Sequence, residues 1–154
     1  SGRLPEEDAV YYDVSWCMNV GEKIDPEYEK WFQIVYDARE DARQFIQARL
    51  DAGEKVRGYE VDRRLKERFE QLGCAQYLMH RTGHNIGHRC HGIGANLDDY
   101  ETHDDRCLLP GTMFSIEPGL YTDKYGVRLE YDVHITSEGE TKVYGPVQDE
   151  ILVI

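Results

Sequence analysis

The amino-acid sequence predicts an α+β protein in which two helices cover one face of a mostly antiparallel sheet. Three observations point to this arrangement. A first segment alternates between apolar and polar residues as a strand does, two segments then carry apolar residues at helical spacing, and several short strand-like runs follow. A chain of 154 residues can bury one hydrophobic core, so we expect residues 1–154 to belong to a single domain.

The first expected element is a strand over residues 9–20. Apolar side chains fill the even positions from Val10 to Val20, whereas Asp13 and Ser15 lie among the odd positions. Successive residues of a strand point to opposite faces. The pattern therefore predicts a strand with one polar face.

Two amphipathic helices are expected next. Asp25 followed by Pro26 is typical of a helix start, and apolar residues then recur at helical spacing until Gly53. The second helix ends at Gly73, and its apolar stripe consists of Val61, Leu65, Phe69 and Leu72. Both helices are expected to cover a sheet.

Beyond Gly73 the chain is rich in histidine, glycine and acidic residues. Strand-like runs occur at Met113–Ile116 and Val127–Thr136, and a turn is expected at Glu138 and Gly139. Most of the residues that could carry chemistry lie in this part of the chain.

The composition excludes several classes of partner. A net charge of -12, from 30 acidic and 18 basic residues, would repel a nucleic-acid backbone. No apolar run is long enough for a membrane span, and the N-terminal residues do not resemble a signal peptide. We therefore expect a cytoplasmic protein without nucleic-acid or membrane partners, whose four widely spaced cysteines are reduced thiols.

Four of the six histidines fall between His80 and Gly92. Glycines at positions 83, 87 and 92 make a regular helix unfavourable, so an irregular strand or loop is expected. A histidine-rich surface loop is one interpretation, and a mononuclear zinc site is another. The carboxylates nearby must decide between them.

Two carboxylates follow or interrupt apolar strand segments. Burial of Glu117 without a cation would cost several kcal/mol, unless its carboxylate reaches water at the strand end. In Val127–Ile135 strict alternation places Glu130 and Asp132 on one face, which is either exposed to solvent or part of a site. Together Asp13, His84, Glu117 and Glu130 form an oxygen-rich set with one imidazole, which suits Mn, Co or Zn.

Four motifs occur in order along nearly the whole chain. They are Tyr12–Ser15 (YDVS), Thr82–Gly87 (TGHNIG) with His91 after it, Phe114–Gly119 (FSIEPG) and Gly126–Glu130 (GVRLE). Together they resemble the pita-bread metallopeptidases of family M24, which include methionine aminopeptidases, Xaa-Pro aminopeptidases and prolidases. The details around His80 and Arg128 resemble the Xaa-Pro aminopeptidase and prolidase branch.

This resemblance implies a metal-dependent hydrolase. Two divalent ions, Mn, Co or Zn, would share a hydroxide that attacks an N-terminal peptide bond, most simply an Xaa-Pro bond of a peptide substrate. The implied metal ligands are Asp13, His84, Glu117 and Glu130.

Catalytic roles are also implied by the resemblance. Glu117 would accept and pass on a proton, while His80 and His91 would contact the substrate and the transition state. Arg128 would support Glu130. The implied fold is the pita-bread fold, present here as an incomplete C-terminal portion of the catalytic domain.

One expected ligand is missing from the pattern. Members of the family carry a second aspartate about eleven residues before the one matched by Asp13, and Gly2 occupies that position. The alternative function is therefore a non-catalytic module that binds peptides or proteins. For the chain itself we expect weak binding of a single metal ion, little activity, and association with the missing half-domain or with further copies of the chain.

Overall fold

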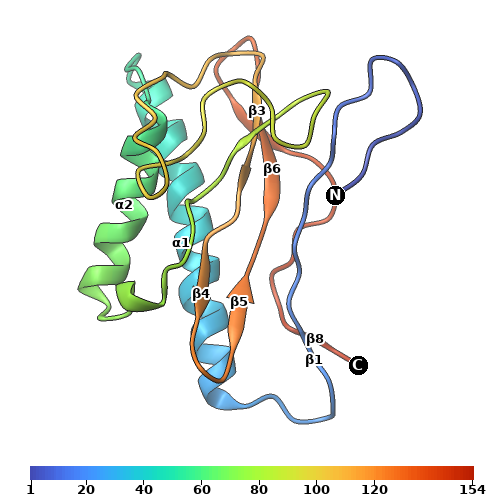
Figure 1. The fold of residues 1–154 in the computed structure, drawn as a ribbon, viewed down its shortest axis with the longest axis vertical. Helices are drawn as coiled ribbons and strands as arrows, with labels where there is room; N and C mark the ends of the chain where they lie inside the picture. The colour runs from blue at the N-terminus through green and yellow to red at the C-terminus, as the bar shows by residue number, and fades with distance from the viewer.

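The computed structural model describes residues 1–154 (Figure 1). In chain order the elements are β1 (Met18–Asn19), α1 (Pro26–Asp51), α2 (Gly58–Gln71), the 3₁₀ helix η1 (Ala75–Tyr77), β2 (Asn85–Ile86), β3 (Met113–Ile116), β4 (Gly119–Tyr121), β5 (Gly126–Arg128), β6 (Tyr131–Ile135), β7 (Thr141–Val143) and β8 (Leu152–Val153). The central sheet is antiparallel with the order β2-β3-β6-β7, β4 and β5 form a hairpin, and β1 pairs with β8 in parallel. The predicted α+β class is confirmed.

Both helices form where their local signals predict them. α1 begins at Pro26, and the side chain of Asp25 caps it by accepting a hydrogen bond from the backbone N–H of Glu27 at 2.9 Å. Gly53 and Gly73 follow the two helices with φ angles of 69° and 67°. Glycine adopts this left-handed conformation without steric cost, so both predicted ends are confirmed.

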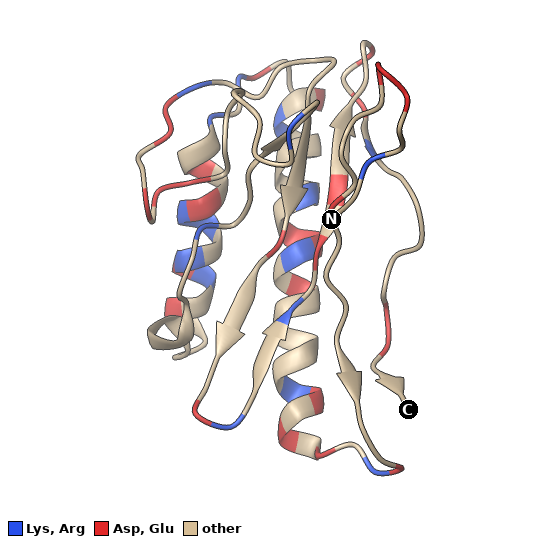
Figure 2. Cartoon of the chain, turned by 45° about the vertical axis from the view of Figure 1, so that its right-hand side comes forward, with Lys and Arg blue, Asp and Glu red and all other residues tan.

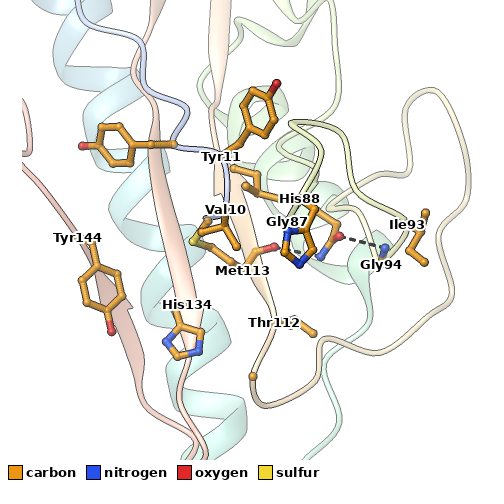
Figure 3. A pocket seen from close by; sticks show the side chains of 14 residues that line it. Val10, Tyr11, Gly87, His88, Ile93, Gly94, Thr112, Met113, His134 and Tyr144 are labelled. Atoms are coloured by element: carbon orange, nitrogen blue, oxygen red, sulfur yellow. Dashed lines mark hydrogen bonds between the residues drawn. The ribbon is translucent and has the colours of Figure 1, made fainter. Parts of the chain in front are cut away.

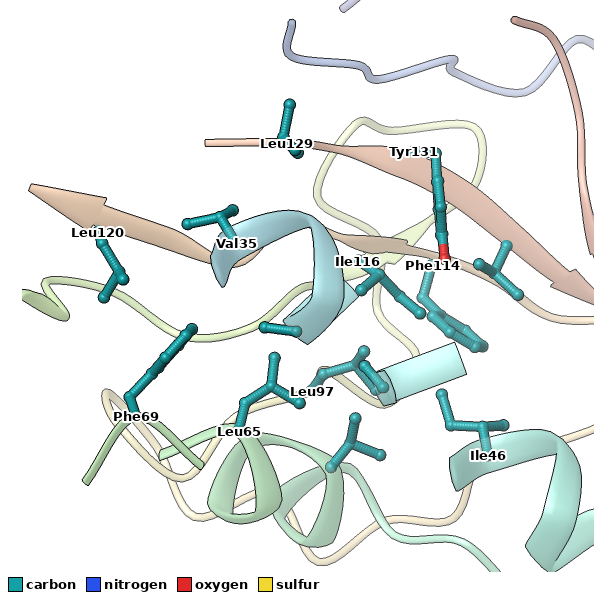
Figure 4. Packing of buried hydrophobic residues seen from close by; sticks show 14 of the residues in the cluster. Val35, Ile46, Leu65, Phe69, Leu97, Phe114, Ile116, Leu120, Leu129 and Tyr131 are labelled. Atoms are coloured by element: carbon teal, nitrogen blue, oxygen red, sulfur yellow. The ribbon is translucent and has the colours of Figure 1, made fainter. Parts of the chain in front are cut away.

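The hydrophobic core lies between the helices and the strands (Figure 4). α1 contributes Val35 and Ile46, and α2 contributes Leu65 and Phe69. The strands and loops opposite them supply Leu97, Phe114, Ile116, Leu120, Leu129 and Tyr131. Figure 1 shows both helices on the same side of the sheet, which leaves its other face free for polar residues.

The strand expected over residues 9–20 is wrong in its extent. Only Met18–Asn19 forms a strand there, and the rest is extended chain held by isolated bridges, Gly2 with Tyr12 and Ser15 with Glu130. The pairing partners of this segment are Gly2, Glu130 and β8, which lie in three separate parts of the chain. The alternation of apolar and polar residues correctly predicts an extended backbone, but it cannot predict the hydrogen-bond partners that define a strand.

The single run expected at 127–136 is divided in two. β5 ends at Arg128 and pairs with β4, whereas β6 begins at Tyr131 and pairs with β3 and β7. Between them the backbone N–H of Glu130 donates to the carbonyl oxygen of Ser15 at 3.1 Å. The chain therefore crosses from the hairpin to the central sheet at Glu130, which turns this side chain inward.

The extended N-terminal segment exposes its apolar side chains and turns its polar ones toward the protein. Exposed members of the apolar set are Val10, Tyr12, Trp16, Met18 and Val20. Asp13 and Ser15, from the other side, are partly buried. This orientation carries the carboxylate of Asp13 onto the free face of the sheet.

Charged residues of both signs occur along α1 and α2, as Figure 2 shows. No helix of the chain combines the length and the apolar composition that a membrane span requires. The outer faces of the two helices are therefore polar, and the other face of the sheet holds the candidate site.

Candidate metal centre

Three chain segments bring carboxylates to one histidine. His84 directly precedes β2, and its Nε2 atom lies 3.3 Å from Oε1 of Glu117, which follows β3. The same nitrogen lies 3.7 Å from Oδ2 of Asp13. Glu130 enters between β5 and β6, and one donor atom each of Asp13, His84 and Glu130 lie within 4.8 Å of one another. The fold therefore gathers all four residues that the motifs single out.

The tautomer of His84 follows from its other ring nitrogen. Nδ1 lies 3.2 Å from the carbonyl oxygen of Asn85, and because a carbonyl oxygen only accepts, Nδ1 carries the proton. In the neutral imidazole Nε2 is then an unprotonated acceptor, and it faces the carboxylate oxygens of Glu117 and Asp13. An acceptor surrounded by acceptors is unfavourable unless a cation lies between them.

The pKa values of the buried acids indicate the same shortage of positive charge. Burial raises the pKa of Glu117, and burial together with the nearby Glu117 charge raises the pKa of Glu130 to about 7. Burial likewise raises the pKa of Asp132 to about 7. The pKa of His84 is lowered, mainly by burial, so its imidazole stays neutral and can donate a lone pair.

This donor set fits a divalent cation. Carboxylate oxygens and one imidazole are ligands that Mn, Co and Zn accept, and a cation would remove the cost of burying several acids together. In addition, Oδ1 of Asp132 is buried without a hydrogen-bond partner. The site thus carries more buried acceptors than donors.

Hydroxyl groups and one backbone N–H hold the acids in place. Ser15 Oγ donates to Glu130 Oε2 at 2.7 Å, and Ser115 Oγ donates to Glu117 Oε1 at 3.2 Å. The backbone N–H of Asp13 donates to Asp132 Oδ2 at 2.8 Å. Sequence reasoning did not assign these roles to Ser15, Ser115 or Asp132, although the strict alternation around Glu130 placed Asp132 on the same face.

The other residues with expected catalytic roles lie around this cluster. The ring of His91 stands edge-on to that of His84, with centroids 4.3 Å apart. Nη1 of Arg128 lies 3.9 Å from Oε2 of Glu117, and Nε of Arg128 donates to Ser15 Oγ at 3.2 Å. His80 is further from the cluster and contacts the hydroxyl of Tyr121 at 2.8 Å. Their catalytic roles stay predictions.

An apolar groove (Figure 3) lies beside the cluster and is lined in part by Asn85, the residue that follows His84. Ile86 lies two residues beyond His84, and Met113 lies two residues before Ser115, so both side chains continue the face that carries the site. The cavity has a volume of about 720 Å³. Further residues that line it are Val10, Tyr11, Tyr12, Ile93, His134 and Tyr144.

Gly83 allows the close approach that positions His84. A Cβ atom at this residue would lie 2.0 Å from the carbonyl oxygen of Ser115, a distance that the paired backbones cannot accept. Gly83→Ala is therefore expected to destabilise the protein by roughly 1–3 kcal/mol and to weaken metal binding, because His84 must move. Urea denaturation and calorimetric titration with zinc would measure the two effects.

Gly87→Ala is the matched control. A Cβ atom at Gly87 meets no atom within 4 Å, so this variant should keep both stability and metal affinity. Equal zinc affinities of the two variants would contradict the role assigned to Gly83.

Comparison with known proteins identifies the family of this chain. The profile described as metallopeptidase family M24 matches residues 6–137. The chain belongs to metallopeptidase family M24.

Individual M24 relatives agree with this assignment. The probable dipeptidase PepE of Mycobacterium tuberculosis is 36% identical over 90 residues, which cover 57% of this chain and 23% of PepE. A prolidase from Thermococcus sibiricus is 26% identical with a TM-score of 0.77, covering 96% of this chain and 39% of that one. An X-Pro aminopeptidase from Thermotoga maritima is 25% identical with a TM-score of 0.77, covering 96% and 40%.

The M24 chain therefore spans about 40% of the length of these solved structures. Its helices and antiparallel sheet are part of the pita-bread fold, which confirms the predicted fold. Members of family M24 are metallopeptidases that generally use a dinuclear metal centre. The assignment of single residues as ligands stays a prediction, supported by the geometry around His84.

Proposed function

We propose that the protein containing this chain is a metal-dependent aminopeptidase or dipeptidase that cleaves the N-terminal peptide bond of Xaa-Pro peptides. The observation that carries this proposal is the position of His84 Nε2, which faces the oxygens of Glu117 and Asp13 at 3.3 and 3.7 Å in an M24 chain. The printed names of its relatives, among them dipeptidases, prolidases and an X-Pro aminopeptidase, support the substrate class.

The residues of the chain have distinct tasks in this proposal. Two divalent ions, when bound, supply a hydroxide nucleophile near neutral pH. Asp13, His84, Glu117 and Glu130 hold the ions. The buried Glu117 also accepts a proton and returns it to the leaving amine. His91, beside His84, donates a hydrogen bond to the developing oxyanion.

The groove next to the site supplies a place for the peptide. Its lining combines apolar side chains such as Ile86 and Met113 with the aromatic rings of Tyr11 and Tyr144. Ligand pockets are commonly apolar with a few polar groups that fix orientation. We propose that the apolar part of a short peptide lies in this groove while its first peptide bond reaches His84 and Glu117.

A further carboxylate ligand would come from outside residues 1–154. The bridge between Gly2 and Tyr12 brings the nitrogen of Ser1 to 3.6 Å from Oδ1 of Asp13. A residue that precedes Ser1 would therefore lie beside Asp13. We propose that an aspartate there completes the pair of ions, and that the chain alone binds one ion weakly.

The exposed apolar side chains of the N-terminal segment need a cover in the whole protein. Trp16 and Met18 are exposed on the face opposite Asp13, and exposed apolar surface is typical of an interface. We propose that the remaining part of the catalytic domain packs there.

Peptide hydrolysis by the longest available form of the protein tests the proposal. Ala-Pro should be cleaved in the presence of Mn, Co or Zn ions, Ala-Ala should be cleaved more slowly, and a chelator should abolish both reactions. If the protein binds peptides but cleaves none with any of these ions, the proposal fails and a non-catalytic binding module is supported instead.

A further inference from the structure

A thiol lies at the edge of the candidate metal centre. Cys90 Sγ is 2.9 Å from Oδ2 of Asp13. One donor atom each of His84, Cys90 and His91 lie within 4.8 Å of one another, so two imidazoles and one sulfur converge. This second group of donors shares His84 with the carboxylate group formed by Asp13, His84 and Glu130.

The loop that carries Cys90 and His91 is held by specific hydrogen bonds. Asn85 accepts from the backbone N–H of Gly92 through its carbonyl oxygen at 2.7 Å and from that of Gly94 through Oδ1 at 3.0 Å. The side chain of Asn85 fills the space beside both glycines, where a Cβ atom would come within 2.1 and 2.5 Å of it. The loop can therefore return close to β2.

A further hydrogen bond ties this loop to the segment that carries Asp13. The backbone N–H of Tyr11 donates to the carbonyl oxygen of Gly87 at 2.9 Å. The loop is thus fixed to β2 by Asn85 and to the N-terminal segment by Tyr11. Both attachments direct Cys90 toward Asp13 and His84.

The other cysteines have different surroundings. Cys17 and Cys74 are buried members of the hydrophobic core, and Cys107 is partly buried in the loop that pairs with Arg57. Neither group of potential metal-binding residues includes any of the three. Cys90 is the only cysteine that is partly exposed and also has a sulfur close to two imidazoles, those of His84 and His91.

We propose that Cys90 is a metal ligand of this centre, and that its thiolate, together with the imidazole of His84, favours zinc and other thiophilic cations over manganese. The inference rests on the proposed metal centre and specifies its metal preference. As the sulfur–metal bond forms, the thiol proton leaves to solvent. Thiolate and imidazole ligands select Zn, whereas manganese prefers carboxylate and water oxygens.

X-ray absorption spectroscopy of the zinc-loaded chain tests this inference directly. A sulfur neighbour is expected at about 2.3 Å from zinc, in addition to nitrogen and oxygen neighbours at about 2.0–2.2 Å. With cobalt in place of zinc, a thiolate-to-cobalt charge-transfer band is expected in the near ultraviolet. Both signals should vanish in Cys90→Ser.

Cys107→Ser is the matched control, because it removes another partly exposed thiol. It should retain the sulfur neighbour and the zinc affinity, whereas Cys90→Ser should lower the zinc affinity by about tenfold or more and leave the manganese affinity unchanged.

Two other outcomes would overturn the inference in different ways. Zinc bound by nitrogen and oxygen alone would leave the metal centre intact and exclude Cys90 as a ligand. If the unsubstituted chain binds neither zinc nor cobalt, both the thiolate ligand and the proposed metal centre fail.

Discussion

Replacing Glu117 with glutamine is expected to lower peptide hydrolysis by about 10²- to 10⁴-fold, the range typical of a lost general acid–base group. Glutamine keeps the size of the side chain but can neither accept a proton nor carry the negative charge that faces His84 Nε2 at 3.3 Å. The initial rate of Ala-Pro cleavage at saturating metal would measure the loss. Circular dichroism of both proteins would establish that the fold is retained.

Glu138→Gln is the control for this experiment. Glu138 is exposed in the turn between β6 and β7, where it accepts a hydrogen bond from Ser137, and its replacement should leave the rate unchanged. A rate in Glu117→Gln equal to that of the control would exclude Glu117 as the proton acceptor.

The second large effect concerns the stability of the metal-free chain. The pKa of Glu130 is raised from 4.5 to about 7, first by burial and then by the charge of Glu117. A carboxyl group whose pKa is raised on folding stabilises the protein below its unfolded pKa, and this contribution is lost as pH rises through the folded pKa. Without metal, the ionised Glu130 therefore destabilises the folded chain above about pH 7.

Glu130→Gln isolates this contribution. Near pH 8 the metal-free variant should be more stable than the unsubstituted chain by roughly 3 kcal/mol, and near pH 5 the difference should fall below about 1 kcal/mol. The pKa values of His80 and His84 are lowered in both proteins. Their effect on stability therefore largely cancels when the two unfolding free energies are subtracted. Urea denaturation at the two pH values would measure it.

Added zinc should reverse the order of stability. Zinc binding stabilises the folded chain through Glu130, whereas the variant lacks this ligand and should gain less. If the difference in unfolding free energy between the two metal-free proteins is the same at both pH values, the inference that ionised Glu130 destabilises the folded chain is wrong.

Local signals were sufficient to predict the helices. Asp25 and Pro26 mark the start of the first helix, and Gly53 and Gly73 mark the ends of the two helices. The side-chain cap and the positive φ angles depend only on these residues and their immediate neighbours. The strand at 113–116 was also predicted with its observed bounds. In contrast, the extended segment around Asp13 depends on bridges to Gly2 and Glu130, which no local pattern contains.

The motifs were sufficient to bring His84, Glu117 and Glu130 into one hypothesis. They could not predict the contact between Cys90 and Asp13, which joins residues 77 positions apart, or the contact between Asp13 and Asp132, which joins residues 119 positions apart. Such contacts arise from packing of distant segments. The alternation of charges around Glu130 left open whether that face is exposed, and the burial of Glu130 and Asp132 shows that it is not.

Anomalous diffraction from crystals soaked in zinc tests the central claim most directly. The account predicts a peak at the zinc absorption edge among the side chains of Asp13, His84 and Glu130, within coordinating distance of His84 Nε2. A complete soak with no peak at this position, or with a peak only at other histidines of the chain, would contradict it.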